Sequence, residues 1–209
     1  MRSVTAAPEQ ADRTPAGTPG GTPSDLSVTA LILAVAGALW FGWGQAEPPA
    51  SWGLPLVIGM LAAIVVAIGA AVAVRRFRHG ATAMADQRVR RGYGITVGAE
   101  VAAIAIGSVG LGLAGRPAYT APWILLVVGV HFVPLGRLFG SANLVWSGLV
   151  LAAVAIAAAV TGAVSAVEPS AVTGAFGGLV LVAAAAASLR QALVRGRLEE
   201  RTAGGLRDG

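Results

Sequence analysis

Six long apolar runs constrain the fold of this chain more than any other feature. Each run holds about 20 mostly apolar residues, the length that a helix needs to cross the hydrocarbon core of a bilayer. The runs lack the alternation of apolar and polar residues that a lipid-facing β-barrel requires. We therefore predict an all-α bundle of six membrane-spanning helices arranged as three antiparallel hairpins. The predicted spans are residues 26–45, 53–74, 93–113, 121–139, 144–165 and 171–189.

The composition agrees with a membrane protein and defines three regions. Of the 209 residues, 56% are hydrophobic and only 12% are charged, which leaves too little polar surface for a water-soluble domain. Residues 1–25 are rich in Pro, Gly and Thr and are predicted to form a disordered tail. The six-helix domain then covers residues 26–189, and a basic C-terminal tail covers residues 190–209.

The arginines predict how the chain is oriented in the membrane. Arginines accumulate in the cytoplasmic loops of membrane proteins. Along a six-span path, nearly all arginines of the loops and tails fall on one side, whereas Arg116 falls on the other side together with Glu47 and Glu168. We therefore expect both termini in the cytoplasm and a multi-pass protein of the inner (plasma) membrane. The arginines that predict this are Arg2, Arg13, Arg75, Arg76, Arg78, Arg88, Arg90, Arg91, Arg137, Arg190, Arg195, Arg197, Arg201 and Arg207.

The same charge distribution indicates the partners. The net charge of +5 comes from arginines beside apolar runs, so topology and anionic lipid headgroups explain it without nucleic acid. The expected partners are the lipid bilayer and those headgroups, with a homo-oligomer or another membrane protein left open. Gly94 and Gly98 form a small-xxx-small pair, which we expect to pack within one subunit in preference to a dimer interface.

Two ionisable residues, Glu100 and His131, lie well inside predicted spans. An isolated charge there is costly, so such residues usually face the bundle interior and find a partner. Both lie roughly 10 Å from the cytoplasmic ends of their spans at 1.5 Å per residue, so antiparallel neighbours would bring them level. On the third span, Thr96 shares the face of Glu100 with small residues at helical spacing, which predicts that this face packs inward.

Pro134 and Arg137 complete the candidate polar site. Pro134 removes the hydrogen bond that would reach the carbonyl of Val130, so we expect a kink and a small polar pocket near His131. Arg137 lies close by, near the cytoplasmic end of the fourth span. A carboxylate paired with an imidazole could relay protons or bind a cation, because imidazole titrates near neutral pH. The same pair could instead hold two helices together, and the lack of a further ionisable residue in the membrane core favours this structural role.

The sequence provides little for metal or nucleophilic chemistry. It has no cysteine, which excludes disulfides and thiolate ligands, and its two histidines, His79 and His131, do not make a multi-histidine metal site. Hydrolase, zinc-protease and phosphate-loop motifs are absent as well. We therefore expect no cofactor, no metal and no catalytic residue.

Residues 128–139, ValGlyValHisPheValProLeuGlyArgLeuPhe, follow TrpIleLeuLeu and a span that carries a glutamate. This stretch resembles a pattern in a group of small bacterial integral membrane proteins to which no activity is attached. The resemblance covers mainly the third and fourth spans. It implies a bacterial inner-membrane protein and assigns no catalytic or binding residue.

Three functions are compatible with the sequence. The first is a non-enzymatic structural, regulatory or partner-binding membrane module, which the shortage of polar residues in the spans favours. The second is a small transporter or proton-coupled permease that uses Glu100 and His131. The third is a lipid-acting enzyme with Glu100, His131 and Arg137 as acid, base and phosphate clamp.

Overall fold

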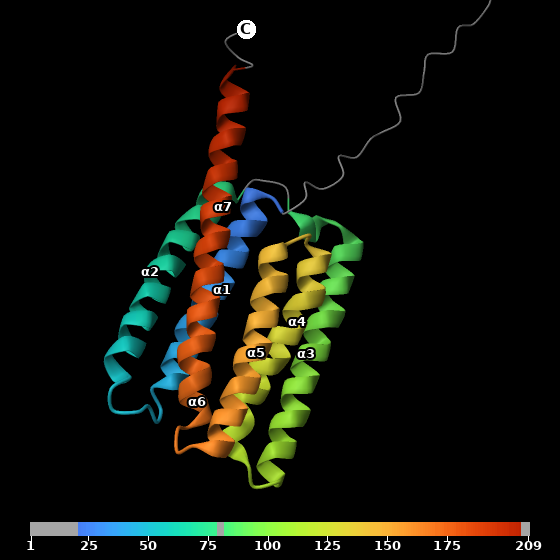
Figure 1. Ribbon diagram of the computed structural model, residues 1–209. Helices are drawn as coiled ribbons and strands as arrows, with labels where there is room; N and C mark the ends of the chain where they lie inside the picture. The colour runs from blue at the N-terminus through green and yellow to red at the C-terminus, as the bar shows by residue number, and fades with distance from the viewer. Residues whose placement is uncertain (1–20, 79–81, 206–209) are drawn as a thin grey trace, which may run out of the picture.

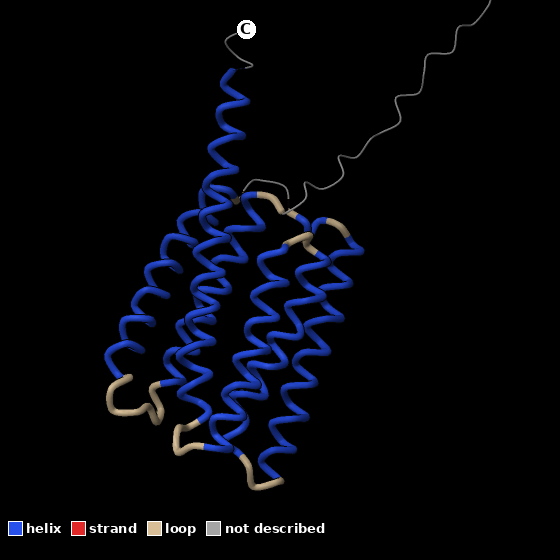
Figure 2. The backbone as a smooth tube through the Cα atoms, viewed as in Figure 1, coloured by secondary structure: helices blue, strands red, loops and turns tan. Residues whose placement is uncertain are grey.

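The computed structural model describes residues 21–78 and 82–205, which form a bundle of long helices (Figure 1). All regular secondary structure in these residues is helical (Figure 2), which confirms the all-α prediction. Six helical segments are long and apolar enough to cross a membrane. The predicted N-terminal tail lies mostly outside the described residues, as does His79. The spans are α1 (Pro23–Gly44), α2 (Gly53–Phe77), α3 (Gln87–Leu113), α4 (Thr120–Leu138), α5 (Ala142–Val164) and a sixth built from α6 (Pro169–Val172), the π-helical η3 (Thr173–Gly177) and α7 (Gly178–Gly205).

The helix ends follow from local sequence. Thr22 and Asp25 form a capping box at the start of α1, and the Asp86 carboxylate accepts from the Arg88 amide at 2.7 Å at the start of α3. Gly115 and Gly140, with φ of +67° and +61°, follow α3 and α4. Glycine suits these left-handed positions because it has no Cβ. Two short 3₁₀ turns, η1 (Ala83–Ala85) and η2 (Pro117–Tyr119), lie just before α3 and α4.

The six spans group into two sets of three, α1 with α2 and α7, and α3 with α4 and α5. The predicted hairpin of the fifth and sixth spans is therefore not the main packing of the last helix, because α7 packs chiefly along α1. Glycines that bring the sixth span close to α1 explain this packing. The sequence alone did not show which two glycines meet. A Cβ on Gly174 would lie 2.3 Å from the Cα of Gly44, so the two backbones are in direct contact.

The second set is held together in the same way. A Cβ on Gly129 of α4 would lie 2.6 Å from the amide nitrogen of Ala152 on α5. A Cβ on Gly148 of α5 would likewise lie 2.5 Å from the Gly129 carbonyl oxygen. The α4–α5 turn thus joins the most intimately packed pair of this set, while α3 packs less extensively on α4.

The two sets share one apolar core. Leu33 of α1, Leu125 of α4, Leu151 of α5 and Leu181 of α7 belong to a single buried cluster. Near the arginine-rich end, the Asn143 side-chain amide of α5 donates to the Ala184 carbonyl and the Ser188 hydroxyl of α7, at 3.1 and 3.0 Å. A seam between α5 and α7 therefore connects the two sets.

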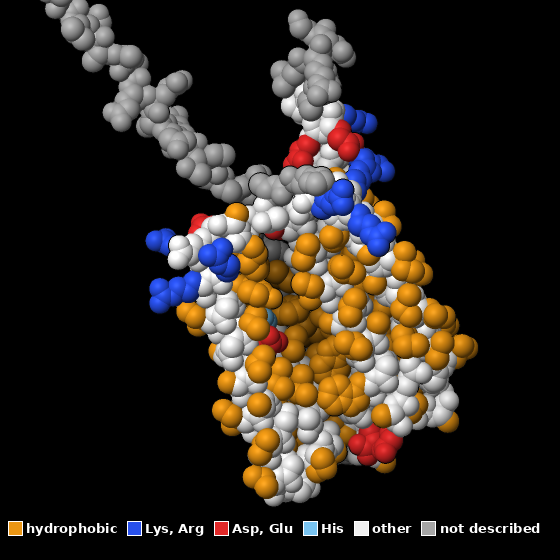
Figure 3. Space-filling model, turned by 180° about the vertical axis from the view of Figure 1, so that it is seen from behind, with side chains coloured by type: hydrophobic (Ala, Val, Ile, Leu, Met, Phe, Trp, Pro, Cys, Tyr) orange, Lys and Arg blue, Asp and Glu red, His pale blue; other side chains and the backbone are white. Residues whose placement is uncertain are grey.

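The charged residues mark the two ends of the bundle. Basic side chains gather at one end together with some acidic ones, whereas the charged side chains visible at the opposite end are acidic (Figure 3). The segment predicted as a basic tail is helical as far as Gly205, because α7 continues beyond the bundle (Figure 1). There Glu200 pairs with Arg76 of α2 at 2.7 Å. We call this the arginine-rich end.

Candidate functional site

Glu100 of α3 and His131 of α4 meet inside the bundle. The Nε2 atom of His131 lies 3.4 Å from Oε2 of Glu100. The histidine side chain is 7% exposed and the glutamate side chain is 17% exposed. The equal depths of the two residues on antiparallel spans predicted this juxtaposition.

Glu100 lies on the one face of α3 that is sheltered. No residue of α3 is fully buried, but a stripe at helical spacing is half-buried, and it includes Thr96, Glu100, Ala103 and Gly107. The predicted inward face therefore packs on α4. Thr96 takes no part in the ion pair, since its hydroxyl donates to the Gly92 carbonyl of its own helix at 2.8 Å.

A tryptophan fixes α3 on α4 beside the pair. The indole Nε1 of Trp123 on α4 donates to the Ala103 carbonyl of α3 at 3.1 Å. The ring occupies the space left by Gly107, where a Cβ would lie 2.0 Å from Nε1. The register that places Glu100 opposite His131 therefore depends on an aromatic residue and a glycine as well as on the charges.

Pro134 and Arg137 do not join the pair. Pro134 lies four residues after Val130, on the same face of α4, and both are exposed. His131 is the next residue along the helix after Val130 and is buried. The kink and the polar pocket expected at the proline stay predictions. Arg137 is exposed near the end of α4 and does not converge on the pair.

The pair lies deep in the span. Glu100 follows Arg91 by nine residues, about 14 Å along α3 at 1.5 Å per residue. The bilayer's hydrocarbon core is roughly 30 Å thick, so the carboxylate lies inside it and away from its surface. His131 precedes Arg137 by six residues, about 9 Å along α4.

A hollow opens at the surface beside the pair. Seen from behind, apolar side chains line this hollow, and its wall holds an acidic side chain next to a histidine (Figure 3). It lies between α1 and α4, which belong to different helix sets and are not closely packed along their lengths. We call this hollow, with Glu100 and His131 in its wall, the α1–α4 groove.

One nitrogen of the imidazole has no partner. Nδ1 of His131 makes no hydrogen bond with any described residue. The atom is enclosed by the protein around it, so it is not part of the surface of the groove. Unpaired buried polar atoms are uncommon and cost about 1–3 kcal/mol each.

Away from the arginines, α1 and α4 are joined through their side chains. Trp40 of α1 and Ala121 and Leu125 of α4 are 7%, 2% and 0% exposed and belong to the shared core. This packing lies toward the end of the bundle where Glu47 and Glu168 lie.

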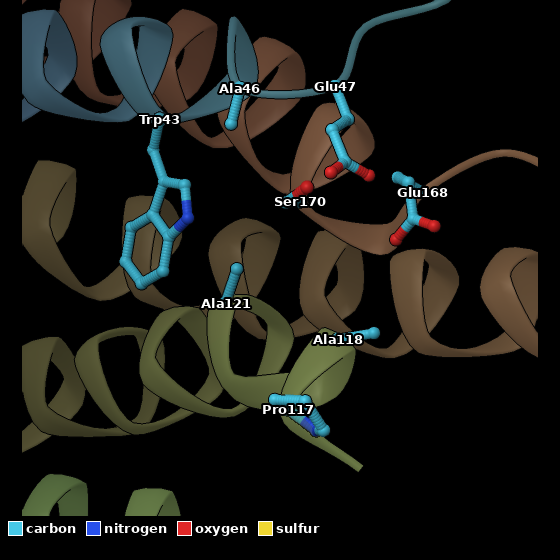
Figure 4. A pocket seen from close by; sticks show the side chains of 8 residues that line it. All are labelled: Trp43, Ala46, Glu47, Pro117, Ala118, Ala121, Glu168 and Ser170. Atoms are coloured by element: carbon cyan, nitrogen blue, oxygen red, sulfur yellow. The ribbon is translucent and has the colours of Figure 1, made fainter.

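A second pocket, of about 360 Å³, lies at that end (Figure 4). The carboxylates of Glu47 and Glu168 lie near the Ser170 hydroxyl, with the Trp43 ring across the opening (Figure 4). The sequence predicted that both glutamates lie on this side of the membrane, but not that they line one pocket. Both precede a proline in a connector at the same end, Glu47–Pro48 and Glu168–Pro169. This shared dipeptide could have indicated that the two glutamates lie close together.

Within the described residues, no three His, Cys, Asp or Glu side chains are grouped closely enough to hold a metal ion. The polar chemistry inside the bundle therefore centres on Glu100 and His131. Comparison with protein families, with curated proteins and with solved structures finds no match for this chain.

Proposed function

We propose that this multi-pass membrane protein is a non-enzymatic binding module that holds a membrane-resident molecule in the α1–α4 groove. We place it in a bacterial inner membrane with both termini in the cytoplasm. The gathering of arginines at one end supports that orientation. The Glu100–His131 pair is the polar contact of the groove.

The observation that carries this proposal is an apolar hollow with an ion pair in its wall, inside a span (Figure 3). An occupant of the hollow would meet the carboxyl group of Glu100, whose side chain is 17% exposed. Its apolar remainder would cover the side chains that line the hollow (Figure 3). An ion pair that served only to join α3 to α4 would need no hollow beside it.

The position of Arg137 favours a binding module over a lipid-acting enzyme. Such an enzyme would need a carboxylate, an imidazole and a phosphate clamp around one reacting group. Arg137 is exposed and six residues from His131, so these three groups do not surround a common point. Glu100 and His131 instead contact each other directly.

Native mass spectrometry tests the proposal. Protein released from membranes should carry one small molecule per chain, and the double variant Glu100→Leu/His131→Leu should carry much less. Leucine at both positions removes the polar contact without leaving an unpaired charge. Gly110→Ala on α3 is the matched control, because no atom lies within 4 Å of the added Cβ. Equal retention of the molecule by the wild type and the double variant would contradict the proposal.

A proton-coupled transporter is the second candidate. The observation in its favour is the buried Glu100–His131 ion pair, because ionisable pairs inside membrane spans serve as proton relays. Proteoliposomes with a pH gradient test it with amphiphilic ammonium ions as substrates. Flux that disappears in Glu100→Gln supports transport, and no flux above that of empty liposomes rejects it.

A further inference from the structure

We propose that the pocket at the end of the bundle opposite the arginines binds a small organic ammonium ion with a short hydrocarbon part. The ammonium group lies between the carboxylates of Glu47 and Glu168, and the hydrocarbon part lies against the Trp43 ring. This site is separate from the α1–α4 groove, and it does not depend on the function proposed for the groove.

The first step is how the pocket is built. Three segments far apart in the chain enclose it, namely the end of α1 with the connector after it, η2 with the start of α4, and the α5–α6 connector with α6. Glu47 and Glu168 are each followed by a proline, which restricts the backbone that holds them. The volume of about 360 Å³ is at the lower end of the range for pockets that hold small molecules.

The second step is the division of the pocket into a polar and an apolar side. Glu47, Glu168 and Ser170 lie together on one side, whereas the Trp43 ring and the apolar side chains of η2 and α4 lie on the other (Figure 4). A molecule that fills the pocket therefore needs a polar end and a hydrocarbon part.

The third step is the charge of the polar end. Within the part of the chain that the structure describes, the side chains of Glu47 and Glu168 make no hydrogen bond and no ion pair. Arg116, which precedes η2, is exposed and pairs with neither of them. Two carboxylates in one pocket repel each other, and a cation between them removes that repulsion. A primary ammonium group has three N–H donors, enough for both carboxylates and the Ser170 hydroxyl.

The fourth step is the aromatic ring, which favours an organic cation over a metal ion. The Trp43 ring stacks on Trp40 with centroids 5.3 Å apart and planes at 14°, and Trp40 is buried. The stacking fixes the Trp43 ring, whose side chain remains 39% exposed as an apolar surface for a ligand. A calcium ion would need about six or more oxygen ligands, and an indole supplies none. No third acidic side chain joins the two glutamates in the described residues.

The test compares three probes on the full-length protein in a nonionic detergent at pH 7, by isothermal titration calorimetry. The probes are phenethylammonium chloride, 2-phenylethanol and calcium chloride. An alkylamine is protonated at this pH, since the similar amine of lysine has a pKa of about 10. The alcohol keeps the hydrocarbon part without the charge, and calcium keeps the charge without the hydrocarbon. We expect the ammonium ion to bind at least about tenfold more tightly than either, because hydrogen bonds to charged groups are the strong ones.

Two variants show whether the ammonium group meets the carboxylates. Glu168→Gln and Glu47→Gln each remove one charge and keep the shape of the side chain, and each should weaken binding of phenethylammonium about tenfold. Glu199→Gln is the matched control, because it also removes one charge, but from an exposed and unpaired glutamate at the arginine-rich end. It should bind phenethylammonium as the wild type does. Unchanged unfolding midpoints without ligand show that each variant is folded.

The outcomes separate this site from the groove. The double variant Glu100→Leu/His131→Leu should bind phenethylammonium as the wild type does, since the proposed site contains neither residue. Equal binding of phenethylammonium and 2-phenylethanol overturns the proposal, as does tighter binding of calcium. The proposal is also overturned if Glu47→Gln and Glu168→Gln bind like Glu199→Gln, or if no probe binds.

Discussion

Trp123 lies against Gly107 so closely that a Cβ at position 107 would come within 2.0 Å of the indole Nε1. The same nitrogen donates to the Ala103 carbonyl at 3.1 Å. Because no residue of α3 is fully buried, this contact and the Glu100–His131 pair are the main polar attachments of α3 to the bundle. The position of α3 thus decides whether the groove keeps its polar wall.

Gly107→Ala should displace the Trp123 ring and weaken its hydrogen bond. We expect a loss of about 1–3 kcal/mol in the free energy of unfolding, because the added methyl group overpacks a filled space. Thermal or denaturant unfolding in detergent measures it. Gly110→Ala on the same helix meets nothing within 4 Å and should be neutral or slightly stabilising. Equal stabilities of the two variants would contradict the described packing of α3 on α4.

Gly174→Ala should destabilise the protein because two backbones touch there. Its Cβ would lie 2.3 Å from the Gly44 Cα, and backbone cannot move aside as a flexible side chain can. We expect a loss of about 3 kcal/mol. Gly42→Ala on α1 is the control, with nothing within 4 Å. An unaffected Gly174→Ala protein would contradict the packing of the sixth span on α1.

Glu100 and His131 should be coupled energetically. Glu100→Leu or His131→Leu alone leaves one polar group without its partner inside the span, which should cost about 1–3 kcal/mol. The double variant should lose less than the sum of the single losses. A double-mutant cycle on unfolding free energies measures the difference. Strictly additive losses would mean that the 3.4 Å contact contributes nothing to stability.

The predicted orientation can be tested by cysteine labelling, because the natural chain has no cysteine. Ala46→Cys lies at the end opposite the arginines, and Thr202→Cys lies on the projecting part of α7. In spheroplasts, a membrane-impermeant maleimide should label the Ala46→Cys variant. It should leave the Thr202→Cys variant unlabelled until the cells are lysed. The reverse pattern would place the termini outside the cytoplasm.

The six spans could be predicted because each depends only on local composition. A run of about twenty apolar residues identifies a span whichever helices pack against it. Prolines such as Pro48 and Pro169 interrupt the helices and mark the connectors. The Glu100–His131 contact was also predictable, because depth in a membrane follows from counting residues along adjacent antiparallel spans.

Packing partners could not be predicted in the same way. Glycines in a span show that something approaches closely, but not which helix does so. Gly174 meets α1, whereas Gly94 and Gly98, which we expected to pack within the subunit, meet nothing within 4 Å. The groove escaped prediction for this reason, since it exists where α1 and α4 fail to pack closely.

The most direct test of the binding site is the ¹⁵N NMR spectrum of His131. The chain has two histidines, so His79→Gln leaves His131 as the only labelled imidazole. Our account predicts that the Nε2 resonance will differ between protein that retains its bound molecule and protein from which that molecule has been stripped, because Nε2 faces the Glu100 carboxyl group that the molecule contacts. The same Nε2 resonance in both samples would contradict it, because no molecule in the groove would then contact the ion pair.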